Sequence, residues 1–295
     1  MNPENGRYCL IQIFDPKTPM LRKVYYLLPP VLRFFFRRLI YFPLDLFRSK
    51  SGLVPPRGLI YTGRGDFIQQ GLEWRKLFIQ EAGLLADHTV LDIGCGIGRI
   101  AIGLTTFLQG RYEGFDAVKT GIEWCRENIS PRYPNFHFQY VDLFNDLYKS
   151  DGRSAIDFSF PYTNDTFDFV CVISVFSHLL APELEHYMKE LKRVLKPGGH
   201  AVMTFFILDQ DSMDGMKRDK KGMQFHVKQD IPYALMDRRV QSANVAYHRI
   251  YLDDLFMVNK LDHIKEYRGR WSGKRPGVDY HPLAFQDIVI VKKVE

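Results

Sequence analysis

Short apolar runs alternate with stretches of helical spacing through the middle of the chain. Apolar positions over residues 67–83 have helical spacing, and Gly83 is expected to end that helix. The runs expected to form strands are 89–93, 112–115, 136–140, 167–174 and 200–208. The helices expected between them are 98–109, 118–129 and 182–195. Strands that alternate with helices form βαβ units, so the pattern predicts a doubly wound α/β domain around a parallel sheet.

This alternation separates an expected core from the rest of the chain. Residues 1–66 form an extension rich in proline, arginine and aromatic side chains, and residues 67–208 form the core. Residues 209–250 are polar, carry four methionines and hold no clear strand, so we expect an inserted substrate lid. Residues 251–295 return to the core pattern. Their expected elements are a helix over 252–261 and strands over 263–267 and 285–292.

Charge is distributed unevenly along the chain. The formal net charge is +6. Residues 17–50 hold eight lysines and arginines against Asp45 alone, a net of +7, which leaves about −1 for the rest. An enzyme that binds nucleic acid usually carries its basic surface on the catalytic domain. The distribution therefore argues against nucleic acid as a partner.

The cysteines and the apolar runs predict a cytoplasmic chain without a membrane span. None of the cysteines has the spacing of a metal site, and we expect reduced thiols; they are Cys9, Cys95, Cys125 and Cys171. The longest uncharged run of the extension, residues 24–32, is interrupted by two prolines. It is far shorter than the roughly 20 apolar residues of a span. The start also lacks the features of a signal peptide.

The feature that carries the chemistry is the run VLDIGCGIGR at residues 90–99, where an expected strand meets a helix. Glycines at such a turn let the backbone approach a ligand, and the helix N-terminus presents N–H groups. A dinucleotide-binding GxGxxG or GxGxxA loop needs a small residue where Arg99 stands. A carboxylate before the loop, Asp92, would repel a pyrophosphate and suits a ligand with a cationic amino-acid end.

This run resembles motif I of the class I S-adenosylmethionine-dependent methyltransferases, and the resemblance extends over residues 67–208. It implies a Rossmann-like methyltransferase fold: a mostly parallel, seven-stranded sheet with helices on both faces. It also implies S-adenosyl-L-methionine as cofactor. The cofactor-binding residues that it implies are Asp92, Gly94, Gly96, Gly98, Asp116, Asp142, Leu143 and Ser174. The run KPGG at residues 196–199 resembles the family's turn before the fifth strand and is given a structural role only.

Three of these positions have expected roles of their own. Asp116 ends the second expected strand, where a carboxylate can accept both ribose hydroxyls. By the resemblance, Asp142 bonds the adenine amino group and Leu143 covers the ring. The alternative for Asp142 is a helix cap or a turn residue. Ser174 ends the fourth expected strand, at the edge that faces the methyl-donor end of the cofactor in the family.

His178, shortly after the fourth expected strand, is the candidate catalytic residue. The donor methyl is already activated on a sulfonium, so the enzyme mainly supplies proximity and orientation. A hydroxyl acceptor must also lose a proton, which a neutral imidazole can take. The alternative is that His178 caps the next helix or packs on the strand end. No metal is expected, because the acidic residues after the fifth strand read as a solvated loop.

The predicted function is methyl transfer to an oxygen of a small-molecule, glycan or lipid-linked acceptor. A nicotinamide-dependent oxidoreductase is one alternative, opposed by Arg99 and Asp92. A non-catalytic protein that binds the cofactor is the other, and it would be expected to show an eroded cofactor loop. Together with the lid, residues after the sixth strand are expected to line a pocket for an anionic or sugar-like acceptor, with a solvated basic hairpin as the alternative. These residues are Arg268, Arg270, Trp271, Lys274, Arg275 and His281.

Residues 20–48 are both basic and aromatic. On a helix, Arg33 and Arg37 stand one turn apart and leave most of the circumference apolar. Such a segment can lie in a membrane interface, here at the inner face of the cytoplasmic membrane, with its aromatics in the acyl boundary and its arginines on anionic headgroups. The alternative is a helix that docks on the core or on a second subunit and buries the phenylalanines at positions 34–36.

Overall fold

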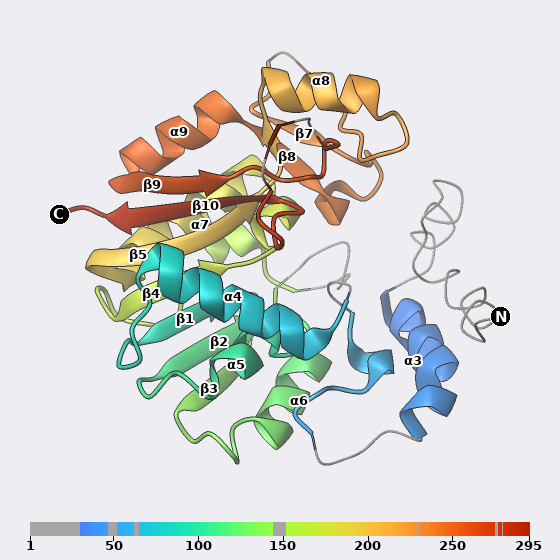
Figure 1. The fold of residues 1–295 in the computed structure, drawn as a ribbon, viewed down its shortest axis with the longest axis vertical. Coiled ribbons are helices and arrows are strands. Elements are labelled where there is room, and N and C mark those ends of the chain that lie inside the picture. The colour runs from blue at the N-terminus through green and yellow to red at the C-terminus, as the bar shows by residue number, and fades with distance from the viewer. Residues whose placement is uncertain are drawn as a thin grey trace.

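A seven-stranded sheet forms the centre of the computed structural model, which describes residues 30–46, 52–61, 65–143, 152–228, 230–274, 277–278 and 280–295. The strand order is β3-β2-β1-β4-β5-β10-β9, and only β10 runs antiparallel to its neighbours (Figure 1). The strands are β1 (Val90–Ile93), β2 (Tyr112–Asp116), β3 (Phe136–Tyr140), β4 (Phe167–Val172), β5 (Leu195–Phe205), β9 (Leu261–Tyr267) and β10 (Asp287–Lys293). The expected doubly wound, mostly parallel sheet is confirmed.

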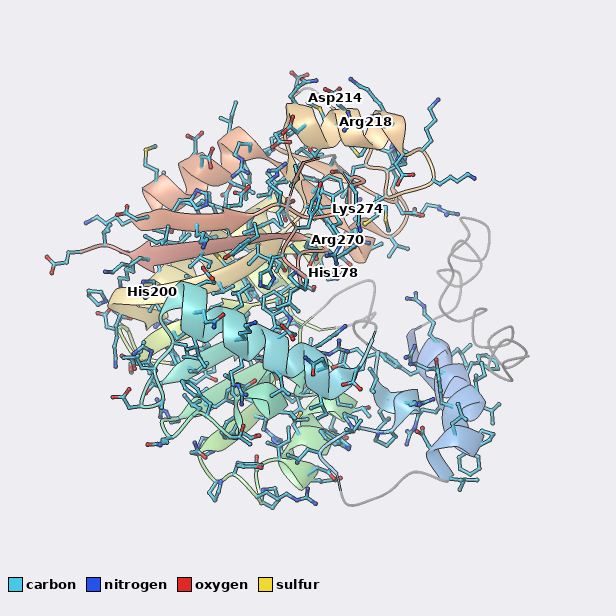
Figure 2. The ribbon with its side chains drawn as sticks, viewed as in Figure 1. His178, His200, Asp214, Arg218, Arg270 and Lys274 are labelled. Carbon is cyan, nitrogen blue, oxygen red and sulfur yellow. The ribbon has the colours of Figure 1, made fainter. Side chains whose placement is uncertain are left out.

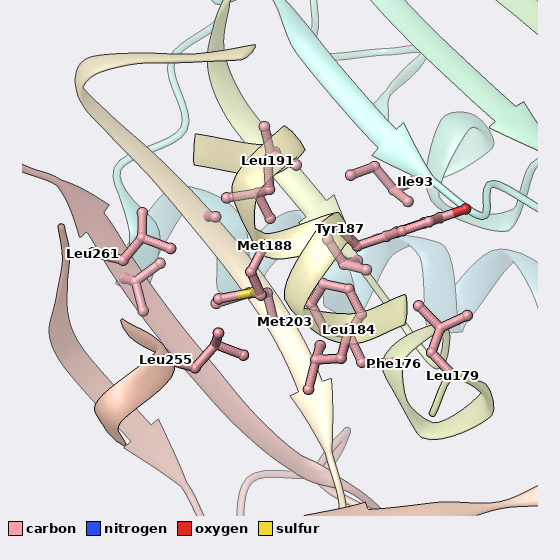
Figure 3. Packing of buried hydrophobic residues seen from close by; sticks show 14 of the residues in the cluster. Ile93, Phe176, Leu179, Leu184, Tyr187, Met188, Leu191, Met203, Leu255 and Leu261 are labelled. Atoms are coloured by element: carbon pink, nitrogen blue, oxygen red, sulfur yellow. The ribbon is translucent and has the colours of Figure 1, made fainter. Parts of the chain in front are cut away.

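Helices cover both faces of this sheet. They are α4 (Phe67–Ala82), α5 (Arg99–Leu104) and α6 (Lys119–Asn128) on one face, and α7 (Ala181–Val194) and α9 (Arg249–Val258) on the other. Successive residues of a strand point to opposite faces, so Val90 joins the first group and Leu91 the second. Figure 3 shows the second face, where Leu184, Met188 and Leu191 of α7 are buried together with Met203 of β5.

The element bounds agree with the sequence pattern where local signals fix them. α4 begins after Asp66, whose side chain accepts a 2.7 Å hydrogen bond from the Gln69 backbone N–H, and ends at Gly83 in a left-handed conformation. The helix expected over 98–109 is shorter and ends at Leu104. The hydroxyl of Thr105 bonds the carbonyl of Ile102 at that point.

Two expectations about the region around and after the fifth strand are wrong. The KPGG run does not precede that strand. It lies within β5, where Gly198 is left-handed and the register against β4 shifts. Residues 209–250 do contain two strands, β7 (Tyr233–Leu235) and β8 (Val245–His248), which join β6 (Ile207–Leu208) in a small sheet of order β6-β8-β7. Helix α8 (Gln210–Arg218) lies beside it (Figure 1).

The small sheet was missed because its strands are short and part of its core comes from elsewhere. Phe206, Phe225 and Trp271 form its centre, and Phe206 and Trp271 lie outside the 209–250 segment. The segment therefore shares a packed core with the loop after β9 rather than forming a separate flap. The remaining short elements are the 3₁₀ turns η2 (Arg57–Leu59), η3 (Ala155–Asp157), η4 (Phe176–His178) and η5 (Gln241–Ala243).

The described part of the N-terminal extension begins with helix α3 (Pro30–Leu46), which stands at one side of the sheet domain (Figure 1). Among the described helices, none has both the length and the apolarity that crossing a bilayer requires. Cys95, Cys125 and Cys171 are buried free thiols. Cys9 lies outside the described residues.

Candidate functional site

The glycine loop joins the end of β1 to the start of α5. Gly94, Gly96 and Gly98 all have positive φ, at 74°, 59° and 80°. Two of them also lack room for a side chain. A β-carbon would lie 2.3 Å from the Val175 side chain at Gly94 and 2.7 Å from that of Ile129 at Gly98. Both the conformation and the close packing require glycine at these positions.

Asp116 meets this loop from the neighbouring strand. It ends β2 and accepts hydrogen bonds from the backbone N–H of Gly96, at 2.8 Å, and of Val118, at 2.7 Å. Burial raises the pKa of its carboxyl to about 6, against the lowering effect of these bonds. The Ala117 backbone N–H and the Tyr61 hydroxyl also act on this carboxylate and lower its pKa, so a ribose hydroxyl would share or replace these donors. The two motifs that sequence analysis paired are therefore in direct contact.

Tyr61 is a third member of this group that sequence analysis missed. Its hydroxyl lies near the Asp116 carboxylate and lowers the pKa of that group. A β-carbon at Gly121 would lie 2.6 Å from that hydroxyl and 2.7 Å from the carbonyl oxygen of Gly96. Tyr61 thus reaches from the N-terminal extension into the angle between the glycine loop and α6. Nothing in the local sequence signals this placement.

Asp92 lies beneath the glycine loop. It is 1 % exposed, and its carboxylate accepts a 2.6 Å hydrogen bond from the Tyr112 hydroxyl and another from the Cys171 thiol. Burial raises the pKa of Asp92 to about 7. The carboxylate thereby links β1 to β2 and β4 under the loop. Its expected contact with the cationic end of a ligand stays a prediction.

Asp142 and Leu143 follow β3 at the same edge of the sheet. Asp142 is exposed, with the Tyr140 hydroxyl 3.4 Å from its carboxylate, while Leu143 is 7 % exposed and belongs to the core. The backbone N–H of Arg153 donates to the carbonyl of Asp142 at 3.1 Å. This bond closes the long connection after β3 back onto the strand end. The adenine roles of both residues stay predictions.

Ser174 lies two residues after the end of β4, in a strained backbone conformation. Its φ is 59°, a left-handed value that a serine adopts only where its surroundings impose it. Its backbone N–H donates to the Thr204 hydroxyl at 2.7 Å, and its own hydroxyl donates to Gln286 at 2.7 Å. Thr204 also donates to Gln286, at 3.0 Å. The ends of β4 and β5 and the start of β10 thus meet in a polar cluster that the sequence did not reveal.

His178 follows this cluster in η4, and Figure 2 labels it beside the carboxyl ends of the central strands. Its Nδ1 lies 2.7 Å from the carbonyl oxygen of Ser242 in η5. Because a carbonyl only accepts, Nδ1 carries the proton and the neutral ring has its lone pair on Nε2. Burial lowers the pKa of His178, against the raising effect of the Ser242 and Ala243 backbone groups beside the ring. This is the protonation state that a general base needs at neutral pH.

Of the two alternative roles for His178, capping the next helix is not observed, whereas a contact at the end of the strand is. It does not cap α7, because the N-cap is Leu180, whose backbone N–H bonds the Glu183 side chain at 2.7 Å. Its bond to Ser242 does connect the end of β4 to the segment expected to be a lid. The Nδ1 hydrogen bond can hold the ring in place while Nε2 takes part in catalysis.

The expected acceptor-binding cations after β9 mostly serve the fold. Arg268 lies 2.7 Å from Asp209, 3.2 Å from Glu266 and 3.6 Å from Asp287. These carboxylates balance its charge. Arg268 therefore gives no reason to expect an anionic acceptor.

Two further side chains of this loop are held in the same way. Arg270 donates to the backbone carbonyls of His281 and Pro282, and Trp271 is 2 % exposed and donates to Asp287 at 2.7 Å. These contacts give Arg268, Arg270 and Trp271 structural roles, and their expected place in an acceptor pocket stays a prediction. His281 is half-buried against the Tyr267 ring. Lys274 is exposed near Arg270 in Figure 2, and Arg275 lies outside the described residues.

Within the ranges that the structure describes, no cluster of three or more histidine, cysteine, aspartate or glutamate side chains is arranged to hold a metal ion.

Comparison with known proteins adds three findings. A family model described as a methyltransferase domain matches residues 90–199, from β1 into β5. A 27-O-demethylrifamycin SV methyltransferase from Amycolatopsis mediterranei is 31 % identical over 42 % of this chain and 41 % of its own length. A fatty-acid O-methyltransferase from Mycolicibacterium smegmatis is 33 % identical over 39 % of this chain and 36 % of its own. The chain thus matches about two fifths of the length of these relatives.

The third finding concerns the fold. The crystal structure of the PH0226 protein from Pyrococcus horikoshii resembles this one with a TM-score of 0.54 and 19 % identity, covering 78 % of this chain and 92 % of that one. At this identity the likeness shows the fold alone.

Proposed function

We propose that this chain, which belongs through residues 90–199 to the class I S-adenosylmethionine-dependent methyltransferase family, transfers the donor methyl to an oxygen of its acceptor. The observation that carries the proposal is the 2.8 Å hydrogen bond between the Gly96 backbone and Asp116. It brings the glycine loop and the carboxylate for the ribose together at the ends of adjacent parallel strands. Doubly wound sheets bind their ligands at this edge.

Each group of the donor has a proposed place along this edge. The glycine loop would hold the amino-acid end, Asp116 the two ribose hydroxyls, and Asp142 with Leu143 the adenine. Ser174 would lie at the methyl-bearing end, beside Thr204 and Gln286. The hydroxyl of Tyr61 at Asp116 supports a further contact, in which its ring closes the ribose side of the donor site.

His178 is the proposed general base. The donor supplies a methyl group on a sulfonium, whose carbon–sulfur bond breaks with its electron pair going to sulfur. The acceptor oxygen forms the new bond to carbon, and its proton passes to Nε2 of His178. The hydrogen bond of Nδ1 to Ser242 holds the ring in the tautomer that can accept this proton. The other residues of the site would bind the donor and the acceptor and orient them for the transfer.

The acceptor class is proposed more broadly: a small molecule, a glycan or a lipid-linked compound. The names of the two relatives above place the methyl on an oxygen, in a rifamycin and in a fatty acid respectively. The internal ion pairs of Arg268 remove one reason to favour an anionic acceptor.

Isothermal titration of the full chain tests the donor. We expect S-adenosylmethionine and S-adenosylhomocysteine to bind with one site per chain, and NAD or NADP to give no heat of binding. The reverse preference would show an oxidoreductase. A second assay follows labelled methyl groups from the donor to a panel of fatty acids, polyketide alcohols and glycans. Donor binding without transfer to any hydroxyl of the panel would favour the non-catalytic alternative.

A further inference from the structure

Helix α3 exposes a continuous apolar stripe. Five of its large apolar side chains are 42–61 % exposed and recur at intervals of three and four residues, so they share one side of the helix. We call them the α3 stripe: Leu32, Phe35, Leu39, Phe42 and Leu46. Side chains of this size are seldom exposed in a row on a surface that meets only water.

The opposite side of α3 is already occupied. Phe34 packs edge-on against Tyr61 with ring centroids 5.6 Å apart. The Asp45 carboxylate accepts hydrogen bonds from the backbone N–H of Arg57, at 2.7 Å, and of Gly58, at 3.0 Å. Arg33 is 6 % exposed. The helix is therefore fixed on residues 57–61 by one side, and the α3 stripe faces away from those residues.

This arrangement revises the prediction for residues 20–48. The three phenylalanines do not act together: Phe35 is 58 % exposed and belongs to the stripe, while Phe34 and Phe36 are half-buried. Neither alternative for this helix is met in full. The helix docks on the chain through Tyr61 and η2, and no described residue outside the helix covers its stripe.

We propose that the α3 stripe inserts into the interfacial region of an anionic lipid bilayer. Amphipathic helices bind such interfaces by burying an apolar face while basic residues contact the headgroups. Arg38 is exposed on the flank of the stripe. In the sequence, Arg22 and Lys23 precede the helix, and Arg48 and Lys50 follow it directly. The net charge of +7 over residues 17–50 complements a negatively charged surface.

The same charge argues against a second copy of the chain as the occupant. Pairing two stripes would bring two segments of +7 together, and like charges at close range repel. Five side chains on one helix also offer only part of the about 800 Å² that each partner of a stable dimer usually buries. A lipid surface satisfies both the apolar stripe and the positive charge.

The test uses the full-length chain and vesicles, without donor or acceptor, so its result is independent of the proposed methyl transfer. Protein is sedimented with vesicles of phosphatidylcholine and phosphatidylglycerol in equal parts, and with phosphatidylcholine alone. We expect binding to the mixed vesicles at low salt, at least tenfold weaker binding to the neutral vesicles, and loss of binding at high salt.

The decisive variant is the double substitution Phe35→Asp and Phe42→Asp. The matched control is Met257→Asp with Val258→Asp on α9, where both side chains are exposed, at 70 % and 72 %, on the opposite side of the molecule (Figure 1). We expect the stripe variant to lose at least tenfold in vesicle partitioning and the control to bind like the wild type. Circular dichroism checks that both fold, and Leu39→Gln repeats the test with a milder change.

Three results would overturn the proposal. One is wild-type protein that stays in the supernatant with mixed vesicles at low salt. Another is equal loss of binding in the stripe variant and in the α9 control. The third is a lipid-free dimer, seen by sedimentation velocity, that the stripe variant dissociates; it would assign the stripe to a second copy of the chain.

Discussion

The hydroxyl of Tyr112 donates a hydrogen bond of 2.6 Å to the buried carboxylate of Asp92. It ties the first residue of β2 to the strand that carries the glycine loop. Burial raises the pKa of that carboxyl from its ordinary value of 3.8 to about 7, even though the Tyr112 bond opposes the rise. The loop therefore rests on a group that binds a proton more tightly in the folded than in the unfolded chain.

This property predicts how stability depends on pH. Because the folded-state pKa of Asp92 is the higher one, its contribution to stability is fully present below about pH 4 and is lost as pH rises to about 7. The variant Asp92→Asn does not titrate. We expect its free energy of unfolding to increase relative to that of the wild type between pH 4 and pH 8, by up to about 4 kcal/mol.

Urea unfolding at pH 4.5, 6 and 8 measures the difference. The comparison between the two proteins cancels the titration of groups that they share. A difference that stays constant over this range would show that Asp92 does not titrate in the folded chain.

The ribose assignment predicts weaker donor binding in Asp116→Ala. The carboxylate would accept two hydroxyls, and a hydrogen bond to a charged group contributes about 1.5–3 kcal/mol. We therefore expect the affinity for S-adenosylhomocysteine, measured by isothermal titration, to fall tenfold or more. Asp262→Ala is the control, because Asp262 is exposed on β9 at the other edge of the sheet. Equal affinities of wild type and Asp116→Ala would place the ribose elsewhere.

The same carboxylate predicts a pH dependence of donor binding. The pKa of Asp116 is raised to about 6, so it is charged at pH 7.5 and increasingly protonated below pH 6. A protonated carboxyl loses part of its acceptor capacity. Donor affinity of the wild type should fall between pH 7 and pH 5, and that of Asp116→Asn should change less. Parallel curves for the two proteins would contradict this reading.

His178→Asn separates catalysis from binding. A general base contributes about 10²- to 10⁴-fold in rate, so we expect a loss of this size in kcat while the donor affinity stays unchanged. The pKa of His178 is lowered, so the wild-type rate should hold from pH 8 down past 6.5 before it declines. A methyl-transfer assay with the acceptor found in the screen provides both readouts. If the variant instead loses donor affinity and rate together, His178 positions the strand end.

We expect substitutions in the loop after β9 to lower the stability of the fold rather than to change which acceptor is used. Trp271→Phe removes the 2.7 Å hydrogen bond to Asp287, which is 1 % exposed and also accepts from the backbone of Ile207 and Gly269. We expect a loss of about 1–3 kcal/mol in the free energy of unfolding. A double-mutant cycle with Asp287→Asn should show coupling between the two positions. Strict additivity would mean that the bond contributes nothing.

The sequence predicted those parts of the molecule that local signals determine. Gly83 marks the end of α4 because a left-handed residue must follow the helix there, and Gly94 and Gly98 mark the loop for the same reason. Asp116 could be placed because one βαβ unit brings the ends of two neighbouring strands together. These inferences need only the pattern of one or two adjacent elements.

The contacts that sequence analysis missed depend on partners far away in the sequence. Ser174 and Gln286, separated by 112 residues, are hydrogen-bonded, and His178 meets Ser242 across 64 residues. Arg268 reads as a free cation until Asp209 and Asp287 are seen beside it. Charge and residue type are visible in a sequence, but the neutralising partner of a charge is a property of the fold.

The contact between Phe34 and Tyr61 links the position of helix α3 to the proposed donor site. Tyr61 lies between the helix and Asp116, so a movement of α3 changes the surroundings of the carboxylate that would hold the ribose. Where a ligand of one site changes the affinity of the other through such an element, the second ligand changes the affinity of the first by the same factor. A chain of this design would retain its cofactor more tightly where α3 is held in place, and would release it more readily where α3 is loose.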